Sequence, residues 1–155
     1  MSRNEVSESS TAAGTLQAAD GEIEYCDVSI VLTDGDDGKV AAIVGKAEEL
    51  GAPKGSKVYV GDTSPCGFGR AEGLGIYLNG TDLPDETYAK CDSNFVRSEL
   101  HRLVEGEGRV MSFWQGNRET AFYLYGNSCA EMQCRIAGFI ASYPLCEKCR
   151  VVQIA

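Results

Sequence analysis

Basic residues are scarce in this sequence, and their scarcity argues against a nucleic-acid-binding protein. The 155 residues include 14 Lys and Arg against 23 Asp and Glu, which gives a formal net charge of −9. Nucleic-acid binding needs clustered Lys and Arg to neutralise phosphates, and the sequence has no such cluster. An acidic chain also avoids anionic membrane surfaces, so we expect a partner selected by charge to be a basic protein.

Long apolar runs are missing as well. No stretch approaches the roughly 20 apolar residues of a membrane helix, and residues 1–10 lack the apolar centre of a signal peptide. We therefore expect a cytoplasmic protein that does not insert into membranes. The seven cysteines are an odd number in a chain without an export signal, so we do not expect a disulfide framework.

Histidine is nearly absent, and the common catalytic motifs are missing. There is no paired-carboxylate, Ser-His-Asp or HExxH pattern, and His101 is the one histidine. Cys129 lies in the first turn of an expected helix, where the helix dipole lowers a thiol pKa. Cys129 and His101 are therefore the candidates for a thiol-dependent catalytic pair. The alternative for His101 is a solvated helix face, because Arg97 and Arg102 are its neighbours.

Residues 1–20 are rich in Ser, Ala, Thr and Glu, with Val6 and Leu16 as the large apolar residues. A segment of this composition buries too little surface to offset its ordering entropy, so we expect a disordered tail. Residues 21–155 keep 20 acids and 13 bases, a net charge of −7. They are numerous enough for a hydrophobic core, and we expect one α+β domain.

Apolar alternation and helical spacing predict six strands and three helices in residues 21–155. The strands are expected over residues 23–33, 57–60, 75–79, 109–114, 120–125 and 150–154. The helices are expected over residues 40–50, 93–104 and 129–143. Gly51 ends the first helix, and a Ser128/Glu131 capping box begins the third.

The order strand–helix–strand occurs three times, with roughly 50 residues between successive units. We expect a two-layer α+β fold of three ferredoxin-like βαβ units, with the helices on one face of a six-stranded sheet. A three-layer sandwich is the rival architecture, but three helices are few for covering two faces. The side chains expected to face the helices are Val28, Ile30, Leu32, Val58, Val60, Ile76, Leu78, Met111, Phe113, Phe122, Leu124, Val152 and Ile154.

The opposite face of this sheet would collect aromatic side chains. These are Tyr25, Tyr59, Tyr77, Trp114, Tyr123 and Tyr125. Tyr and Trp are over-represented in protein interfaces, so we expect the face to bind a protein partner or a second copy of the chain. The alternative is that tyrosine simply suits half-exposed strands. Stacking of single-stranded nucleic acid would require positive charge that this domain lacks.

Cys146-Glu-Lys-Cys149 has the CxxC spacing shared by zinc sites and thiol–disulfide motifs. With Cys129 and Cys134 it could form a four-cysteine zinc site. Residues five apart on a helix share a face poorly, and this CxxC precedes a strand, whereas redox motifs open a helix. Two ordinary cysteines in a tight turn are the favoured interpretation, so no cofactor is expected unless zinc binds this set.

Residues 61–75 contain five glycines and Pro65, which is typical of a mobile loop. Its backbone amides and Arg70 could bind an anion, although neither a P-loop nor a dinucleotide motif is present. The leading function is a small acidic binding protein that uses the aromatic face and this loop. An inhibitor or immunity-type protein against a basic toxin would fit the charge and size. The alternative is a small enzyme or ligand-binding protein with a pocket at residues 61–75, dependent on a thiol.

Overall fold

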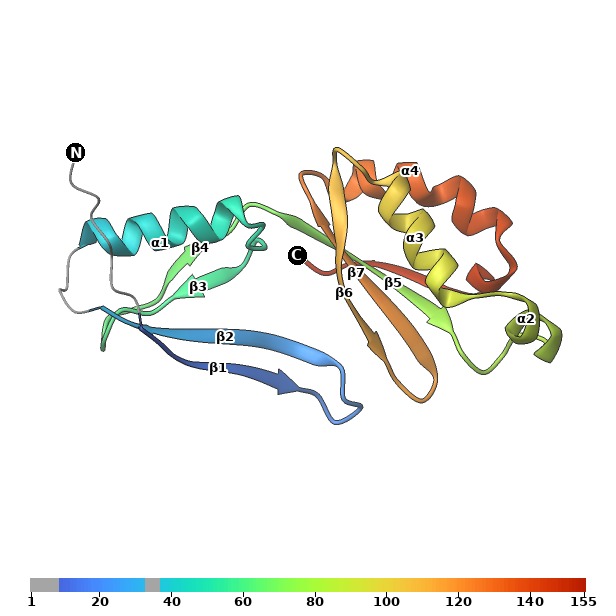
Figure 1. Ribbon diagram of the computed structural model, residues 1–155, viewed down its shortest axis with the longest axis horizontal. Helices are drawn as coiled ribbons and strands as arrows, with labels where there is room; N and C mark the ends of the chain where they lie inside the picture. The colour runs from blue at the N-terminus through green and yellow to red at the C-terminus, as the bar shows by residue number, and fades with distance from the viewer. Residues whose placement is uncertain (1–8, 33–36) are drawn as a thin grey trace. The chain divides into compact units, whose positions relative to one another are not determined.

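A computed structural model describes residues 9–32 and 37–155, and these form a mixed α+β protein (Figure 1). The chain divides into two units, Met1–Ile43 and Val44–Ala155, and helix α1 (Asp37–Glu49) spans the division. None of the helices in the described residues has both the length and the apolarity needed to cross a bilayer.

The first unit contains an antiparallel hairpin of β1 (Ser9–Gln17) and β2 (Ile23–Val31). Its turn is closed by Ala18 N, which donates to Glu22 O at 2.8 Å, and Gly21 supplies a positive φ of 87°. Strand β1 lies within residues 1–20, for which a disordered tail was expected, and the tail itself stays a prediction. Residues 9–17 pair with β2 through their backbones, and residues 1–8 lie outside the described part.

Helix α1 ends as predicted, because Gly51 adopts a positive φ of 98° and Ala52 N donates to Ala47 O at 2.9 Å. A short hairpin follows, made of β3 (Ser56–Val58) and β4 (Cys66–Phe68). Residues 61–75 are therefore not one loop: they contain β4 and the first residues of the next strand. The strand predicted over residues 57–60 also ends earlier than expected, because β3 stops at Val58.

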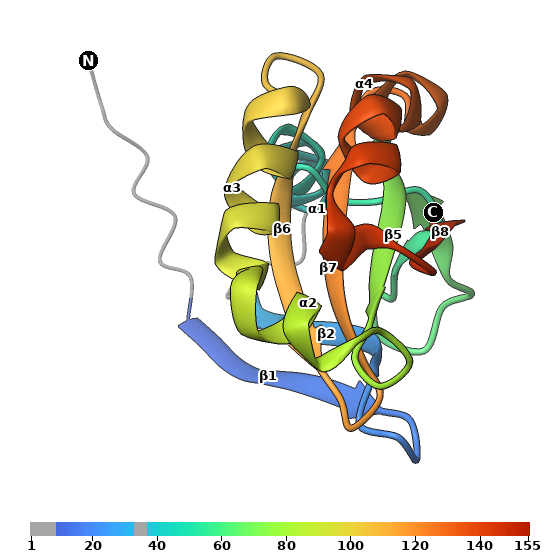
Figure 2. The ribbon, with the colours of Figure 1, turned by 90° about the vertical axis from the view of Figure 1, so that its right-hand side faces the viewer.

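The rest of the second unit has the order βαββαβ. Its strands are β5 (Glu72–Asn79), β6 (Gly108–Gln115), β7 (Glu119–Gly126) and β8 (Arg150–Gln153). Its helices are α2 (Asp85–Lys90), α3 (Ser93–Leu103), α4 (Cys129–Ser142) and the 3-10 helix η1 (Pro144–Cys146). The strands form one antiparallel sheet in the order β6-β7-β5-β8, with α3 and α4 on one face (Figure 2).

The order strand–helix–strand thus occurs twice in this sheet. The predicted set of three units on a six-stranded sheet is wrong for the described residues, which form separate sheets of two, two and four strands. The physical reason is strand pairing. Strand β2 takes its partner from the N-terminal segment and β3 pairs with β4, so neither joins the larger sheet. The single domain expected over residues 21–155 stays a prediction.

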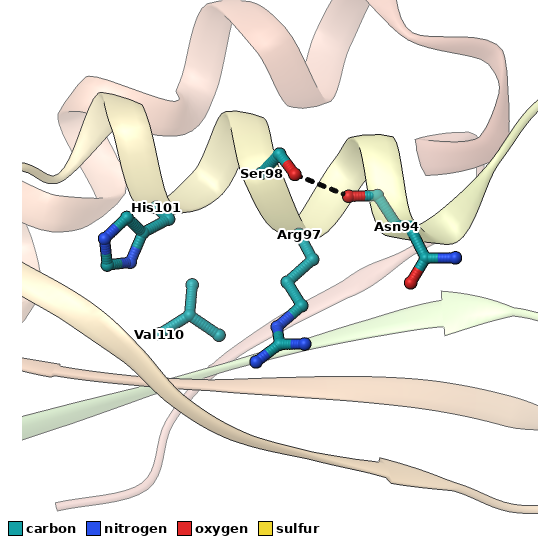
Figure 3. A pocket seen from close by; sticks show the side chains of 5 residues that line it. All are labelled: Asn94, Arg97, Ser98, His101 and Val110. Atoms are coloured by element: carbon teal, nitrogen blue, oxygen red, sulfur yellow. Dashed lines mark hydrogen bonds between the residues drawn. The ribbon is translucent and has the colours of Figure 1, made fainter.

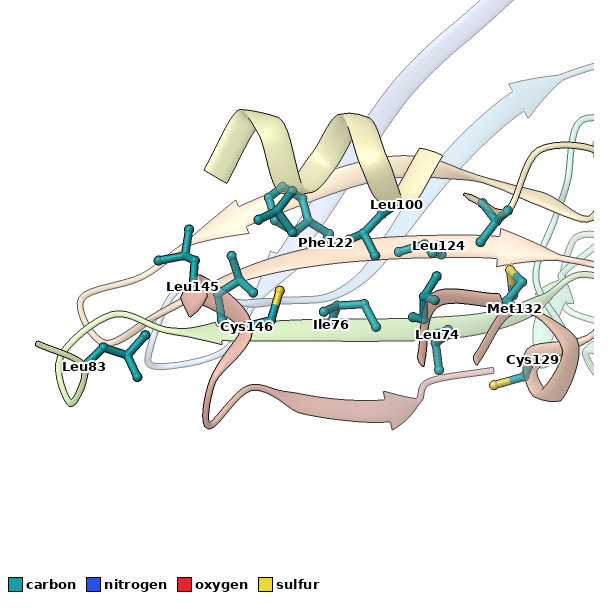
Figure 4. Packing of buried hydrophobic residues seen from close by; sticks show 14 residues of the cluster. Leu74, Ile76, Leu83, Leu100, Phe122, Leu124, Cys129, Met132, Leu145 and Cys146 are labelled. Carbon is teal, nitrogen blue, oxygen red and sulfur yellow. The ribbon is translucent and has the colours of Figure 1, made fainter. Parts of the chain in front are cut away.

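The main core lies between the four-stranded sheet and its helices (Figure 4). The side chains of Leu74, Ile76, Val96, Leu100, Leu124, Met132 and Ile136 are fully buried there. Both long helices begin at capped residues: Asp92 accepts from Asn94 N at 2.8 Å, and Ser128 Oγ accepts from Glu131 N at 3.2 Å. The Ser128 cap is thus confirmed, while the Glu131 carboxylate accepts from Arg135 Nε at 2.9 Å.

The predicted core set is correct on the central strands and wrong at several other positions. Ile76, Leu78, Phe122 and Leu124 are buried, as expected. Val28, Ile30, Val60, Met111, Phe113, Val152 and Ile154 are instead exposed. On β6 an irregularity between Val110 and Ser112 shifts the alternation, so Val110 contacts the core and Met111 does not. On β8 it is Val151 that packs on the core.

Candidate functional site

The six aromatic residues predicted to share one face are divided between different parts of the chain. Tyr25 lies on β2 of the first unit, and Tyr59 follows β3. Tyr77, Trp114, Tyr123 and Tyr125 lie together on the four-stranded sheet, in a cluster separate from the helix-covered core. The sheet therefore gathers four of the six, because Tyr25 and Tyr59 belong to other strand pairs.

Tyr77 and Tyr123 form the centre of this second cluster and are buried, with 7% of each residue exposed. Their rings meet edge to face, with centroids 6.3 Å apart and an interplanar angle of 79°. The Arg150 guanidinium lies over the Tyr77 ring at 4.3 Å, and Glu119 holds it by two hydrogen bonds of 2.8 and 2.7 Å. These two tyrosines stabilise the sheet, and their binding role stays a prediction.

Large exposed apolar side chains are concentrated on the β1–β2 hairpin. They are Leu16, Ile23, Tyr25, Val28, Ile30 and Val31, and every residue of β2 is exposed. Val28, the extreme case, is 64% exposed and stands opposite Ala13. Cys26 stands opposite Thr15, so the β1 residues on this face are too short to cover the β2 side chains. We call residues 9–31 the hairpin surface.

This surface was not predicted, although the sequence contains a signal for it. Asp20-Gly21 precedes a predicted strand, and Asp-Gly between two extended segments is a strong hairpin indicator. The low apolar content of residues 9–17 concealed the first strand. Ala13, Gly14 and Thr15 are small residues that pair through their backbones and add little hydrophobic pattern.

Cys129 lies in a different environment from the one predicted. It is buried, its backbone N donates to Glu72 Oε2 at 2.7 Å, and Lys54 Nζ donates to the other Glu72 oxygen at 2.5 Å. Burial, followed by the negative charge of Glu72, raises the pKa of the Cys129 thiol. The predicted lowering by the helix dipole is therefore outweighed, and Cys129 is a poor candidate for a nucleophile.

The four cysteines of the zinc hypothesis are not brought together. Cys129 begins α4 and Cys146 follows its other end, and a 14-residue helix spans about 21 Å. Cys134 is exposed on α4 while Cys146 is buried. Across residues 9–32 and 37–155, no group of three or more His, Cys, Asp or Glu is arranged to hold a metal ion. The donor set thus does not fit tetrahedral zinc.

The CxxC forms a tight turn, in agreement with the favoured interpretation. Cys149 N donates to Cys146 O at 3.1 Å, and Lys148 adopts a positive φ of 59°. Burial, with smaller contributions from Cys149 and Cys91, raises the pKa of Cys146 to about 12. Cys91 and Cys149 pack against the same core, and no spacing in the sequence indicated that Cys91 would lie there. These are structural thiols of low reactivity.

Alkylation should distinguish these environments. With limiting iodoacetamide at pH 8, we expect the exposed Cys26, Cys66 and Cys134 to react at least tenfold faster than Cys146. The reason is that a thiol of pKa about 12 is a thiolate in only about one molecule in ten thousand at that pH. Peptide mass spectrometry gives the rates, with urea-unfolded protein as the control. Equal rates for Cys134 and Cys146 in folded protein would contradict this assignment.

His101 lines a surface hollow of about 440 Å³ between α3 and β6, together with Asn94, Arg97, Ser98 and Val110 (Figure 3). No cysteine is part of this lining, so the hollow offers no partner for a Cys–His pair. Arg97 points towards β6, where its guanidinium lies 5.7 Å from the centroid of the Phe113 ring.

The glycine-rich residues 61–75 do bind an anionic group, but that group is the Glu48 carboxylate of the same unit. Arg70 Nε pairs with Glu48 Oε2 at 2.8 Å, and Gly69 N donates to Glu48 Oε1 at 3.1 Å. A second hollow, of about 340 Å³, is lined by Lys54, Lys57, Phe68 and neighbouring backbone. This lining includes no Cys, His, Asp or Glu, so it adds no support for a thiol-dependent enzyme at residues 61–75.

Comparisons with protein-family models, with curated proteins and with solved structures give no match to this chain.

Proposed function

We propose that the chain is a small acidic interaction protein that binds a basic protein partner through the hairpin surface. The observation that supports it is the exposure of six large apolar side chains on the two faces of the β1–β2 hairpin: Val28 and Ile30 on one face, and Leu16, Ile23, Tyr25 and Val31 on the other. An isolated two-stranded hairpin is marginally stable in water. Exposed apolar residues that share one face, as Val28 and Ile30 do, are typical of interaction surfaces. A partner that covers Val28 and Ile30 would stabilise the hairpin and gain the free energy of burying them.

Charge selects the class of partner. The hairpin surface carries Asp20, Glu22, Glu24 and Asp27, and residues 9–31 contain no Lys or Arg. An apolar centre with an acidic border complements an apolar groove bordered by Lys and Arg. A second copy of the chain would bring further negative charge to the same surface, which disfavours it. An inhibitor or immunity-type protein acting on a basic toxin has this chemistry, by analogy of charge and size.

The thiols support a cytoplasmic location for this interaction. All seven cysteines are free, and several of them are buried against the core. Free cysteines are usual in reducing compartments, where disulfides are rare. A cytoplasmic protein of this kind would meet its partner there.

Affinity capture with matched variants tests the proposal. Tagged wild-type protein and the double variant Val28→Ser/Ile30→Ser are used to capture partners from the native host. The control is Leu50→Ser/Val60→Ser, which removes two exposed apolar residues outside the hairpin. We expect a basic protein to be retained by wild type and control and lost with the hairpin variant. The purified pair should then bind at least tenfold more weakly in 0.5 M NaCl, because screening acts on the charged border.

Two results would overturn the proposal. One is equal recovery of every captured protein by wild type and hairpin variant. The other is a concentration-dependent dimer in light scattering that the hairpin variant abolishes, since this would make a second copy the occupant. Circular dichroism on both variants checks that α4 and the four-stranded sheet remain folded.

A further inference from the structure

The groove between α3 and strand β6 combines a free strand edge, a positively charged wall and exposed apolar side chains. We propose that this groove binds an extended peptide bearing a carboxylate, which pairs with the edge of β6 and places its carboxylate beside Arg97 and His101. The site is distinct from the hairpin surface and lies wholly within the second unit. Its ligand has the opposite charge preference to that of the hairpin.

The edge of β6 supplies the backbone contacts. In the order β6-β7-β5-β8, β6 is an end strand, paired with β7 on one side and with no further strand of the described sheet on the other. Its eight residues, Gly108–Gln115, are long enough to align a peptide of similar length. Unpaired N–H and C=O groups of an end strand are a template for β-augmentation.

The wall formed by α3 supplies the positive charge. Arg97 and His101 are four residues apart, so they project from the same face of the helix, and both line the hollow with Asn94 and Ser98 (Figure 3). No Asp or Glu is part of that lining, although the chain has 23 of them. By contrast Arg102, on the same helix, forms an ion pair with the Glu99 carboxylate at 2.8 Å.

Arg97 is available for an incoming carboxylate. Among the described residues its one charge-related contact is with the Phe113 ring at 5.7 Å, and the ion pairs of the chain involve other cations. A guanidinium can bind a carboxylate through two parallel hydrogen bonds, which is stronger and more directional than a contact with Lys. The side chain therefore fits a carboxylate that approaches along β6.

Apolar residues of β6 supply the remaining contacts. Phe113 is 53% exposed beneath Arg97, Met111 is exposed, and Val110 lines the hollow itself. An extended peptide presents every second side chain to the same side, so apolar or β-branched residues two positions from an acid would contact Phe113 and Val110. This pattern defines the ligand class: an extended segment with an acid and, two positions before and after it, apolar or β-branched residues.

The test uses a synthetic peptide, acetyl-Thr-Val-Thr-Asp-Val-Thr-Val-amide, and its counterpart with Asn in place of Asp. Titration into ¹⁵N-labelled protein should shift the amides of residues 94–101 and 108–115, and β6 amides should exchange more slowly with solvent. We expect the Asp peptide to bind about tenfold more tightly than the Asn peptide, and Arg97→Gln to remove that difference. The control Arg102→Gln changes the same helix by the same charge and should bind like wild type.

Several outcomes would overturn the inference. They are no shift on residues 108–115 at about 2 mM peptide, equal affinity for the Asp and Asn peptides, or an Arg97→Gln protein that keeps the preference. Shifts on α3 with inorganic phosphate but none on β6 with the peptide would make the hollow an anion pocket only, which also refutes it. The variant Val28→Ser/Ile30→Ser should bind the peptide normally, so failure here and failure of the hairpin proposal are distinguishable.

Discussion

Replacing Ile76 by Ala should destabilise the second unit by about 3–4 kcal/mol, the largest effect that we expect from a single substitution. Ile76 is fully buried on the central strand β5, where it stands opposite Phe122 on β7 and Val151 on β8. The substitution removes three carbon atoms from a position enclosed by two strands and the helices. The surrounding side chains cannot close the resulting cavity without moving the sheet.

Urea unfolding followed by the fluorescence of Trp114, the single tryptophan, measures this loss on the sheet itself. The control is Val152→Ala on β8, because Val152 pairs with Gly75 in the same sheet but is 38% exposed. We expect the control to cost less than about 1 kcal/mol. A loss of that small size for Ile76→Ala would show that the described core is not the one that stabilises the protein.

The sequence predicted the ends of the long helices and the faces of β5 and β7 well, because at these positions the local signals agree with the tertiary structure. Asp92 and Ser128 are side-chain caps at helix starts, and Gly51 ends α1 in the left-handed conformation. The alternation on β5 and β7 correctly separated Ile76 and Phe122 from Tyr77 and Tyr123. Each of these signals depends on residues close in sequence, which is why they could be read without a structure.

Strand pairing could not be predicted in the same way. The pairing of β2 with β1, and not with the larger sheet, could not be predicted from the sequence. The free energy of strand pairing depends on contacts between residues that are distant in sequence. The irregularity between Val110 and Ser112 was also not predictable from the sequence. Because of it, Val110 packs against the core and Met111 is exposed. A one-residue shift exchanges the two faces of a strand, so such errors reverse burial.

The candidate site was likewise predictable in its local residue spacing but not in its tertiary arrangement. The i, i+4 spacing of Arg97 and His101 was visible, but the groove exists only because β6 ends the sheet beside α3. For the aromatic face, the positions on β5 and β7 were predictable and their burial was not. Burial of Tyr77 depends on what lies beneath and above its ring, namely Gly75 and the Arg150 guanidinium.

Gly75 is the residue whose substitution tests that packing. A Cβ at Gly75 would lie 2.7 Å from Cε2 of Tyr77 and 3.3 Å from Cγ2 of Ile154, so a ring covers the position where a side chain would stand. Glycine in a strand interior is normally unfavourable, and a ring packed over it offsets that loss. Replacing Gly75 by Val should raise β propensity and yet destabilise the protein, because the ring has to leave its place against Ala121 and Tyr123.

We expect Gly75→Val to cost about 2 kcal/mol in urea unfolding, with a reduced near-ultraviolet tyrosine signal as the ring loses its fixed environment. Gly67→Val on β4 is the matched control, since no atom lies within 4 Å of a Cβ at that position. In the double variant Gly75→Val/Tyr77→Leu the collision disappears, so the two losses should be less than additive. If Gly75→Val were as stable as wild type, the rings of the second cluster would be loosely held, and Tyr77 and Tyr123 would again be available as a binding surface.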